Sequence, residues 1–241
     1  MSLPKHVAII VDGDRRWARK KGLPDISGHK YVTDKIIEPI IFRCLELSIP
    51  YVTFWAFSTE NWKRGKRFAS ALFSLLRQGL RRSMERYKKA GVRLNTIGDL
   101  SKLPKDLVKD IKHWQDESKN NKKITVTMAL NYGGRDEIIR AINKLIKSKS
   151  GKHLRGEVAP AAHLGGEIVE KDLEQYLDTH SIPDPDLIIR TGGSQRMSGF
   201  MLWQAEYAEF YFTDVLMPDF TVKKLDRALK EFSRRQRRFG K

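Results

Sequence analysis

The feature that most constrains the fold is a series of short apolar runs separated by segments with helical spacing. Several runs are apolar almost throughout, such as VAIIV and YVTFWAF, which is typical of strands buried on both faces of a parallel sheet. The predicted strands are His6–Val11, Tyr51–Phe57, Val92–Gly98, Ile124–Tyr132, Asp186–Thr191 and Glu209–Val215. Since strands and helices alternate, we expect a single α/β domain over residues 1–241, with a central, mostly parallel six-stranded sheet flanked by helices.

Two of the intervening segments carry apolar stripes at helical spacing. Their members are Leu72, Leu75, Leu76 and Leu80 in the first, and Ile138, Ala141, Ile142, Leu145 and Ile146 in the second. The segment 148–167 combines glycine, proline and mixed charge. We interpret it as a surface loop within one domain and not as a domain boundary.

The net charge of +17 restricts the classes of partner. A basic protein attracts nucleic acid, anionic membrane surfaces or phosphorylated small molecules. The single cysteine, Cys44, excludes an internal disulfide and fits a reducing compartment. No apolar run approaches the ~18 residues of a membrane span, and no signal-peptide pattern is present, so we expect a cytoplasmic protein.

Segments with polar side chains that are suited to binding phosphate follow the predicted strands. In an α/β sheet, ligands bind outside the carboxyl ends of the strands, so these segments are where a site is expected. They read DGDRRW (12–17), STENWKR (58–64), GDLSK (98–102), NYGGRDE (131–137) and RTGGSQRMSG (190–199).

The last of these segments has the composition of an anion site. It supplies Arg190 and Arg196 together with two glycines and the hydroxyls of Ser194 and Ser198. Guanidinium forks and backbone N–H groups in glycine-rich turns hold phosphate oxygens. A turn with solvent-facing arginines is the alternative interpretation. The P-loop and G-x-G-x-x-G fingerprints of nucleotide sites are both missing.

Two carboxylates, Asp12 and Asp14, stand among the arginines at the end of the first predicted strand. A carboxylate in a phosphate site is repelled unless a cation bridges the two, and Mg²⁺ is the natural partner. For Asp14, capping of a helix that begins at Arg15 is an equal alternative. His29 fits a structural histidine and a phosphate donor equally well.

Aromatic residues accompany the same sheet edge, namely Trp17, Phe57 and Trp62. Residues of this kind are commonly core, yet their ring faces also stabilise a nearby cation. Diphosphate, Mg²⁺ and an aromatic cleft together point to ionisation of an allylic diphosphate.

With these segments assembled, the sequence resembles the cis-prenyltransferases, the undecaprenyl diphosphate synthase family. The resemblance is carried by HVAIIVDGDRRWARKKG, FWAFSTENWKR, IGDLSKLP, ALNYGGRDEI, DLIIRTGGSQRMSGFMLWQAEYAEFYF and RRFG. It implies a homodimer with a central parallel sheet and an elongated apolar tunnel. The implied reaction adds isopentenyl diphosphate to an allylic diphosphate such as farnesyl or geranyl diphosphate, creates cis double bonds and releases pyrophosphate.

The resemblance also implies roles for individual residues. The implied catalytic residues are Asp12, Asp14, Arg16 and Asn61, and the implied Mg²⁺ ligands are Asp12 and Glu209. The implied contacts to the allylic diphosphate are Gly13, Arg16 and His29. Arg15 and Trp17 are implied to bind substrate as well. The implied contacts to isopentenyl diphosphate are Arg190, Arg196 and Ser198. A flexible segment that closes over the substrates comprises Phe57, Ser58, Asn61, Trp62 and Arg64. The tail residues Arg238 and Gly240 are expected to reach the partner's site.

The sequence departs from the family pattern at several positions. Asp14 stands where the family usually has Asn, Asp25 where many bacterial members have Arg, and Ser194-Gln195 where Glu-His is frequent. These departures leave one alternative open within the family, irregular head-to-middle coupling of dimethylallyl diphosphate as in lavandulyl-type relatives. The helix after NWKR has no insertion relative to common bacterial members, which argues against a very long dolichol-type product.

The positive charge raises two further questions, whether the protein binds nucleic acid and whether it contacts a membrane. A basic nucleic-acid-binding protein is the alternative from another class, but no recognised nucleic-acid motif is present, and we expect no nucleic acid partner. Peripheral contact with an anionic membrane at its inner face is compatible with the enzyme, because a polyprenyl product leaves into lipid.

Overall fold

A computed structural model describes residues 3–150 and 167–235 of the chain. Its centre is a six-stranded sheet in the order β3-β4-β2-β1-β5-β6, and every strand pairing is parallel. The strands are β1 (His6–Ile10), β2 (Tyr51–Ser58), β3 (Val92–Ile97), β4 (Ile124–Tyr132), β5 (Leu187–Arg190) and β6 (Glu209–Phe212). All six predicted strands and the predicted α/β class are therefore confirmed.

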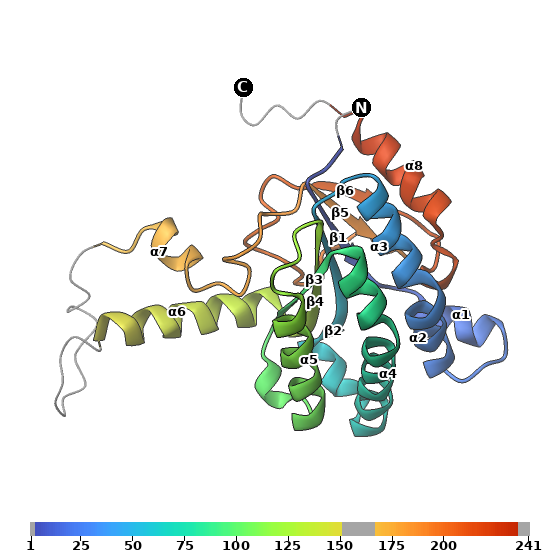
Figure 1. The fold of residues 1–241 in the computed structure, drawn as a ribbon, viewed down its shortest axis with the longest axis horizontal. Helices are drawn as coiled ribbons and strands as arrows, with labels where there is room; N and C mark the ends of the chain where they lie inside the picture. The colour runs from blue at the N-terminus through green and yellow to red at the C-terminus, as the bar shows by residue number, and fades with distance from the viewer. Residues whose placement is uncertain (1–2, 151–166, 236–241) are drawn as a thin grey trace.

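Helices lie on both sides of the sheet in the described residues (Figure 1). The α-helices are α1 (Asp14–Lys20), α2 (Ile26–Tyr31), α3 (Ile37–Glu46), α4 (Lys66–Ala90), α5 (Lys105–Ser118), α6 (Gly134–Ser150), α7 (Glu170–Glu174) and α8 (Val222–Phe232). Shorter turns are the π-helical η1 (Val32–Ile36) and the 3₁₀ segments η2 (Thr59–Arg64), η3 (Leu100–Lys102) and η5 (Met217–Asp219). Helix α6 extends away from the body of the molecule.

Strand β1 shows why the apolar runs are continuous. Val7 and Ile9 pack into a core with α3 and α8, whereas Ala8 and Ile10 pack on the opposite face against Phe200 and its neighbours. Successive side chains of a strand point to opposite faces, so a strand covered on both sides needs apolar residues at every position.

The register of the sheet brings the predicted site segments to one edge. Ile10 is paired with Trp55 on one side and with Arg190 on the other. The residues that follow β1, β2 and β5 therefore leave the sheet together, at the carboxyl ends of the strands, where a ligand site is expected.

The two predicted apolar stripes have different environments. Leu72 and Leu76 of α4 are buried in a core cluster with α5. In α6, Ala141 and Leu145 are buried, but Ile142 and Ile146 are exposed. The predicted loop 148–167 lies mostly outside the described residues. Within the described ranges, none of the helices is long and apolar enough to cross a membrane.

Candidate active site

Asp12 is fixed where it leaves β1. Its backbone N–H donates to the Thr191 hydroxyl over 2.9 Å, and the same hydroxyl donates to the Asp12 carbonyl over 2.7 Å. Gly13 then turns the chain into α1 with φ 107°, and a Cβ there would lie 2.8 Å from Leu216. Thr191 was not among the predicted site residues; its place directly after Arg190 at a strand end was the available signal.

The Asp12 carboxylate lies between two arginines. Arg16 donates to Oδ1 over 3.2 Å, and Arg190 donates to Oδ2 over 3.0 Å. The nearly buried Arg190 also donates to the Ser198 hydroxyl over 2.8 Å and to the Arg196 carbonyl. The predicted anion loop is thus brought beside Asp12, although the Arg196 side chain itself is exposed.

Asp12 forms part of the wall of an open pocket. The pocket is lined by Val11, Asp12, Gly13, Asp14, Arg15, Arg16, Arg19, His29 and Arg64. Four arginines face two aspartates there, so the local charge favours an anionic ligand. Gly13, Arg16 and His29, which are predicted to contact the allylic diphosphate, therefore share one pocket with Arg15.

Asp14 is buried and its carboxylate lies against His29. Oδ2 of Asp14 is 2.7 Å from Nδ1 of His29. The α1 N-cap is Gly13, no side chain caps this helix, and Asp14 is its first residue, so the capping interpretation of Asp14 is wrong. Because Nδ1 faces Asp14, Nε2 is the nitrogen available to a ligand; it is buried without a hydrogen-bond partner among the described residues.

Arg64 reaches the pocket from η2. Its guanidinium lies over the Phe68 ring, 5.3 Å from the ring centre, and His29 meets the same ring edge-on. Burial lowers the pKa of Arg64, and the neighbouring charge of Arg15 lowers it further. The nearby carboxylates of Asp12, Asp14 and Asp25 raise the pKa of Arg64 and offset these effects only in part.

The other predicted residues of the β2–η2 segment support this turn and do not line the pocket. The Asn61 carboxamide accepts a hydrogen bond from the Ser58 N–H over 3.0 Å and so caps η2. Trp62 donates to the Asn131 side chain over 2.7 Å. Phe57 is fully buried against Trp62. Phe57, Ser58, Asn61 and Trp62 therefore stabilise the η2 turn that carries Arg64.

Arg15 and Arg19 share one carboxylate. Arg15 Nε donates to Asp25 over 2.6 Å, and Arg19 donates through Nε and Nη2 over 2.8 and 2.9 Å. Arg19 and then Arg15 lower the pKa of Asp25 to about 2. Arg19 was not predicted from the sequence, because its relation to the pocket depends on the packing of α1 against α2.

Trp17 lies outside the pocket. Its indole is buried beside Tyr31, and its N–H donates to Asp219 in η5 over 2.9 Å. The side chain therefore secures the contact between α1 and η5, and the structure does not bring it to the predicted substrate.

Glu209 and Asp12 lie at opposite ends of the sheet. Glu209 is the first residue of β6 and pairs with Leu187, whereas Arg190, beside Asp12, pairs with Phe212. Three strand residues separate these levels by roughly 10 Å. Glu209 instead accepts from Arg235 over 2.8 Å. The predicted joint metal site of Asp12 and Glu209 is therefore not formed within one chain. Arg238 and Gly240 lie outside the described residues.

The basic face of α4 is largely neutralised. Its cations pair with carboxylates of η1, α3 and α5, and the pairs are Arg77–Asp106, Arg81–Asp110, Arg82–Asp34, Arg86–Glu38 and Lys88–Glu117. The helix therefore contributes less free positive charge than its sequence indicates.

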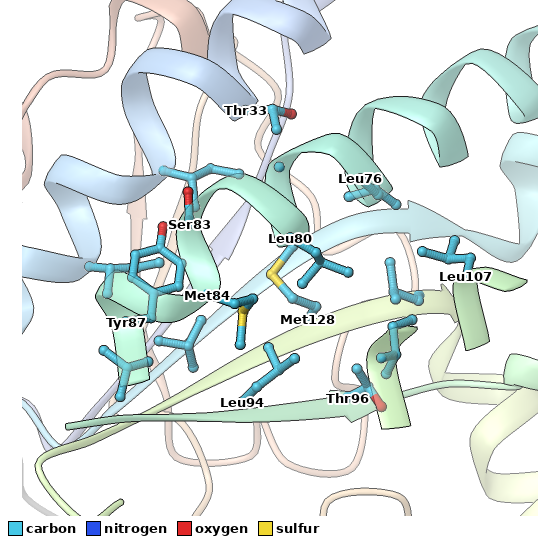
Figure 2. A pocket seen from close by; sticks show the side chains of 17 residues that line it. Thr33, Leu76, Leu80, Ser83, Met84, Tyr87, Leu94, Thr96, Leu107 and Met128 are labelled. Carbon is cyan, nitrogen blue, oxygen red and sulfur yellow. The ribbon is translucent and has the colours of Figure 1, made fainter. Parts of the chain in front are cut away.

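An apolar cavity lies between α4 and the sheet (Figure 2). Aliphatic side chains form most of its wall, and Tyr87 and Leu107 lie on opposite sides of it. Ser83 and Tyr87 are its polar residues on α4, and burial raises the pKa of the Tyr87 hydroxyl.

The cavity and the charged pocket are connected through two elements. Helix α4 carries Phe68, the ring under Arg64, and further along it carries the cavity residues from Leu76 to Tyr87. On the other side, Thr33 lines the cavity and donates to the His29 carbonyl over 3.0 Å. An anion in the pocket could thus have an apolar portion directed along α4.

Comparisons with known proteins agree over the whole length of the chain. Residues 10–240 match the model of the undecaprenyl diphosphate synthase family. The chain is 43% identical to the isoprenyl transferase of Aquifex aeolicus, covering 100% of this chain and 97% of that one. It is 41% identical to the isoprenyl transferase of Thermotoga maritima, covering 100% and 98%.

Two solved structures are similar in fold. Lavandulyl diphosphate synthase from Lavandula x intermedia, in complex with dimethylallyl diphosphate, has a TM-score of 0.89 at 35% identity and 99% coverage of both chains. The probable undecaprenyl diphosphate synthase of Campylobacter jejuni has a TM-score of 0.78 at 35% identity and 100% coverage of both.

Proposed function

Since the chain belongs to the undecaprenyl diphosphate synthase family of isoprenyl transferases, we propose that it condenses isopentenyl diphosphate with an allylic diphosphate. In this reaction the carbon–oxygen bond of the allylic diphosphate breaks, a new carbon–carbon bond forms, and pyrophosphate and a proton are released. The product is a cis-polyprenyl diphosphate.

The observation that carries this proposal is the pairing of an arginine-lined pocket with an apolar cavity along one helix. A prenyl diphosphate has the same two parts, a charged head and a hydrocarbon tail. Arginine forks are suited to the head, and a cavity lined by aliphatic side chains is suited to the tail. A nucleic acid has no hydrocarbon chain that would occupy the apolar cavity.

The residues of the pocket fit Mg²⁺ shared with a substrate. The described residues contain no group of three His, Cys, Asp or Glu side chains that could hold a metal ion alone. Mg²⁺ is typically bound through one or two carboxylates plus substrate phosphates and waters, and Asp12 supplies such a carboxylate. Mg²⁺ held by Asp12 would supply positive charge to the departing pyrophosphate.

The chain's own groups account for the remaining functions. Arg64 and Arg16 bind the allylic diphosphate, and His29 presents Nε2 to it. Arg190, positioned by Asp12 and by the Ser198 hydroxyl, binds isopentenyl diphosphate together with Arg196. These fixed cations stabilise the negative charge that develops on the leaving group.

We also propose that the protein acts as a homodimer. Ile139, Ile142 and Ile146 form an exposed apolar stripe on the protruding helix α6. Apolar stripes of this kind are typical of protein interfaces. A role for Glu209 at the metal requires a second copy of the chain, because the register separates it from Asp12.

A cytoplasmic location with peripheral contact to an anionic membrane completes the proposal. The net charge of +17 supports such contact. Co-sedimentation with vesicles of anionic lipid at low salt is the test, and absence of binding there contradicts it.

One alternative activity is supported by a specific observation. The structure with the TM-score of 0.89 is a lavandulyl diphosphate synthase bound to dimethylallyl diphosphate. Incubation with dimethylallyl diphosphate alone separates the two activities. A branched C10 product supports irregular coupling, whereas no product from this substrate and chain growth with isopentenyl diphosphate support the main proposal.

The main test is release of pyrophosphate from isopentenyl diphosphate and farnesyl or geranyl diphosphate with Mg²⁺ present. Asp12→Ala should abolish this release. Asp110→Ala is a matched control, because Asp110 also pairs with an arginine but lies on α5. Normal turnover by the Asp12 variant contradicts the proposal.

A further inference from the structure

Asp25 precedes α2 and faces two arginines of α1. Arg15 and Arg19 are four residues apart, so they lie on the same face of the helix. Together they give three hydrogen bonds to the two oxygens of Asp25, at 2.6, 2.8 and 2.9 Å. The carboxylate therefore holds both guanidinium groups at once.

The same two arginines line the pocket for the diphosphate. Of its four arginines, Arg15 and Arg19 are held by Asp25, and Arg16 is held by Asp12. Arg64 has no carboxylate partner among the described residues. Half of the arginine charge around the pocket is thus already directed to one internal anion.

We propose that Asp25 sets the affinity for the allylic diphosphate by competing with it for Arg15 and Arg19. The identity of this ligand rests on the proposed function. A diphosphate that recruits either arginine meets a guanidinium whose Nε–H is already donated to Asp25. The positive charge of that guanidinium is also partly neutralised by the carboxylate, so the two anions compete for it. Arg64 and Arg16 then bind the diphosphate first, and Asp25 limits its further binding by Arg15 and Arg19.

Asp25 remains a competitor under all assay conditions near neutrality. Its arginine partners hold its pKa at about 2, so the carboxylate is ionised. The competition also affects the catalytic cycle. Asp25 pairs again with Arg15 and Arg19 when the diphosphate dissociates, which makes the complex with the diphosphate less stable. Release of the product is therefore faster.

Calorimetric titration with inorganic pyrophosphate in EDTA buffer tests the competition without turnover. Asp25→Asn keeps the size of the side chain and removes its charge. We expect pyrophosphate to bind about fivefold more tightly to this variant, the factor for one exposed ion pair at the upper end of its usual range. The gain should shrink as salt is added, because exposed charges are screened.

Asp34→Asn is the matched control. Asp34 also holds two basic residues, Lys30 and Arg82, and its replacement changes the net charge by the same amount. It does not line the pocket, so we expect its affinity for pyrophosphate to equal that of the wild type. An equal gain in affinity for pyrophosphate in both variants would show that the effect comes from the net charge alone, and it would overturn the proposal.

A double-mutant cycle separates the release of Arg19 from a general effect of Asp25→Asn on the pocket. Arg19→Gln should weaken pyrophosphate binding more in the Asp25→Asn background than in the wild type, since only there is Arg19 released. Equal effects in both backgrounds overturn the proposal. So does weaker binding by Asp25→Asn with an unchanged thermal unfolding midpoint, because Asp25 would then orient the arginines for the ligand.

Kinetics link the inference to the proposed function. In Asp25→Asn, the KM for farnesyl diphosphate should fall about fivefold, in parallel with the binding of pyrophosphate. If the wild type releases no pyrophosphate from any allylic primer, the proposed function fails. The calorimetric result still decides whether Asp25 competes for the arginines.

Discussion

Nη2 of Arg190 lies 3.0 Å from Oδ2 of Asp12, although 178 residues separate them in the chain. Arg190 is nearly buried at the end of β5, whereas the Asp12 side chain is about one-third exposed at the end of β1. The parallel pairing of β1 with β5 produces this contact. Asp12 therefore has two tasks, since it faces the pocket and also neutralises a cation that has little access to water.

We predict that Asp12→Ala costs stability as well as activity. Without the carboxylate, the Arg190 charge stays buried and unpaired, which should lower the free energy of unfolding by about 1–3 kcal/mol, less than for a fully buried pair. Arg190→Met alone should also destabilise the protein. Because the double variant no longer contains the charge, it should be more stable than the sum of the single effects, by about 1 kcal/mol.

Urea unfolding of the four proteins measures this coupling. The double variant should remain inactive in the release of pyrophosphate even where its stability recovers. Strictly additive effects on the free energy of unfolding would show that the two side chains are energetically independent.

The length of the product should depend on Tyr87. Tyr87 lines the cavity on α4, eleven residues beyond Leu76 and about 16 Å further along the helix axis. Tyr87→Ala should lengthen the products, because the hydrocarbon chain gains room at the end farther from the charged pocket. Met84→Phe should shorten them by filling the middle of the cavity.

Sizing of labelled products by chromatography measures both shifts. Phe42→Leu is the control, since Phe42 packs against Tyr87 but does not line the cavity, and its product distribution should be unchanged. Identical product distributions in Tyr87→Ala and the wild type contradict the role of the cavity as the tail site.

His6 should make the fold sensitive to acid. Its ring is fully buried, with Nδ1 at 2.7 Å from the Pro183 carbonyl and Nε2 at 2.8 Å from the Thr53 hydroxyl. Burial lowers its pKa from 6.5 to about 4. Between these values the unfolded chain binds a proton that the folded chain rejects, so stability falls as the pH is lowered from 6.5 to 4, by about 3 kcal/mol in total.

The measurement is the free energy of unfolding in urea at pH 7 and pH 5 for the wild type and His6→Gln. Burial raises the pKa of Asp184 to about 6, which opposes the His6 effect in this window, so the comparison uses the difference between the two proteins. His113→Gln, at an exposed histidine, should behave as the wild type. A slope that persists in His6→Gln assigns the effect to another group.

The sheet could be predicted from sequence because its signal is local. Each buried strand needs apolar residues at every position, as in Val7–Ile10, and each strand end needs polar residues where the chain leaves the sheet. Asp12, Arg16 and Arg64 share a pocket for a related reason. Parallel strands end at one edge, so side chains that follow them meet.

The interpretations that differ from the structure depended on the orientation of a side chain or on the register of a strand. A sequence motif contains neither. Trp17 has the composition of a site aromatic, but helical geometry turns it towards Asp219. Glu209 lies in a strand that ends at the site, yet it is the first residue of that strand. In the sequence Asp25 is only a departure from a family pattern, because its partners Arg15 and Arg19 come from another helix.

Helix α6 should supply the dimer interface. Ala141 packs against Leu173 of α7 and against Leu177, and Leu145 is buried, whereas Ile139, Ile142 and Ile146 are exposed on the protruding helix. Burial of one isoleucine at an interface contributes about 2 kcal/mol, and a charge in its place would be desolvated without a partner. Ile142→Glu should therefore convert a dimer into a monomer.

Size-exclusion chromatography with light scattering measures the change. Lys147→Gln alters the net charge by the same single unit on another face of α6, and it should leave the dimer intact. If Glu209 acts across the interface, the Ile142→Glu monomer should also lose release of pyrophosphate while its thermal unfolding stays cooperative. A monomeric wild type at micromolar concentration, or a dimeric Ile142→Glu variant, would place the interface elsewhere.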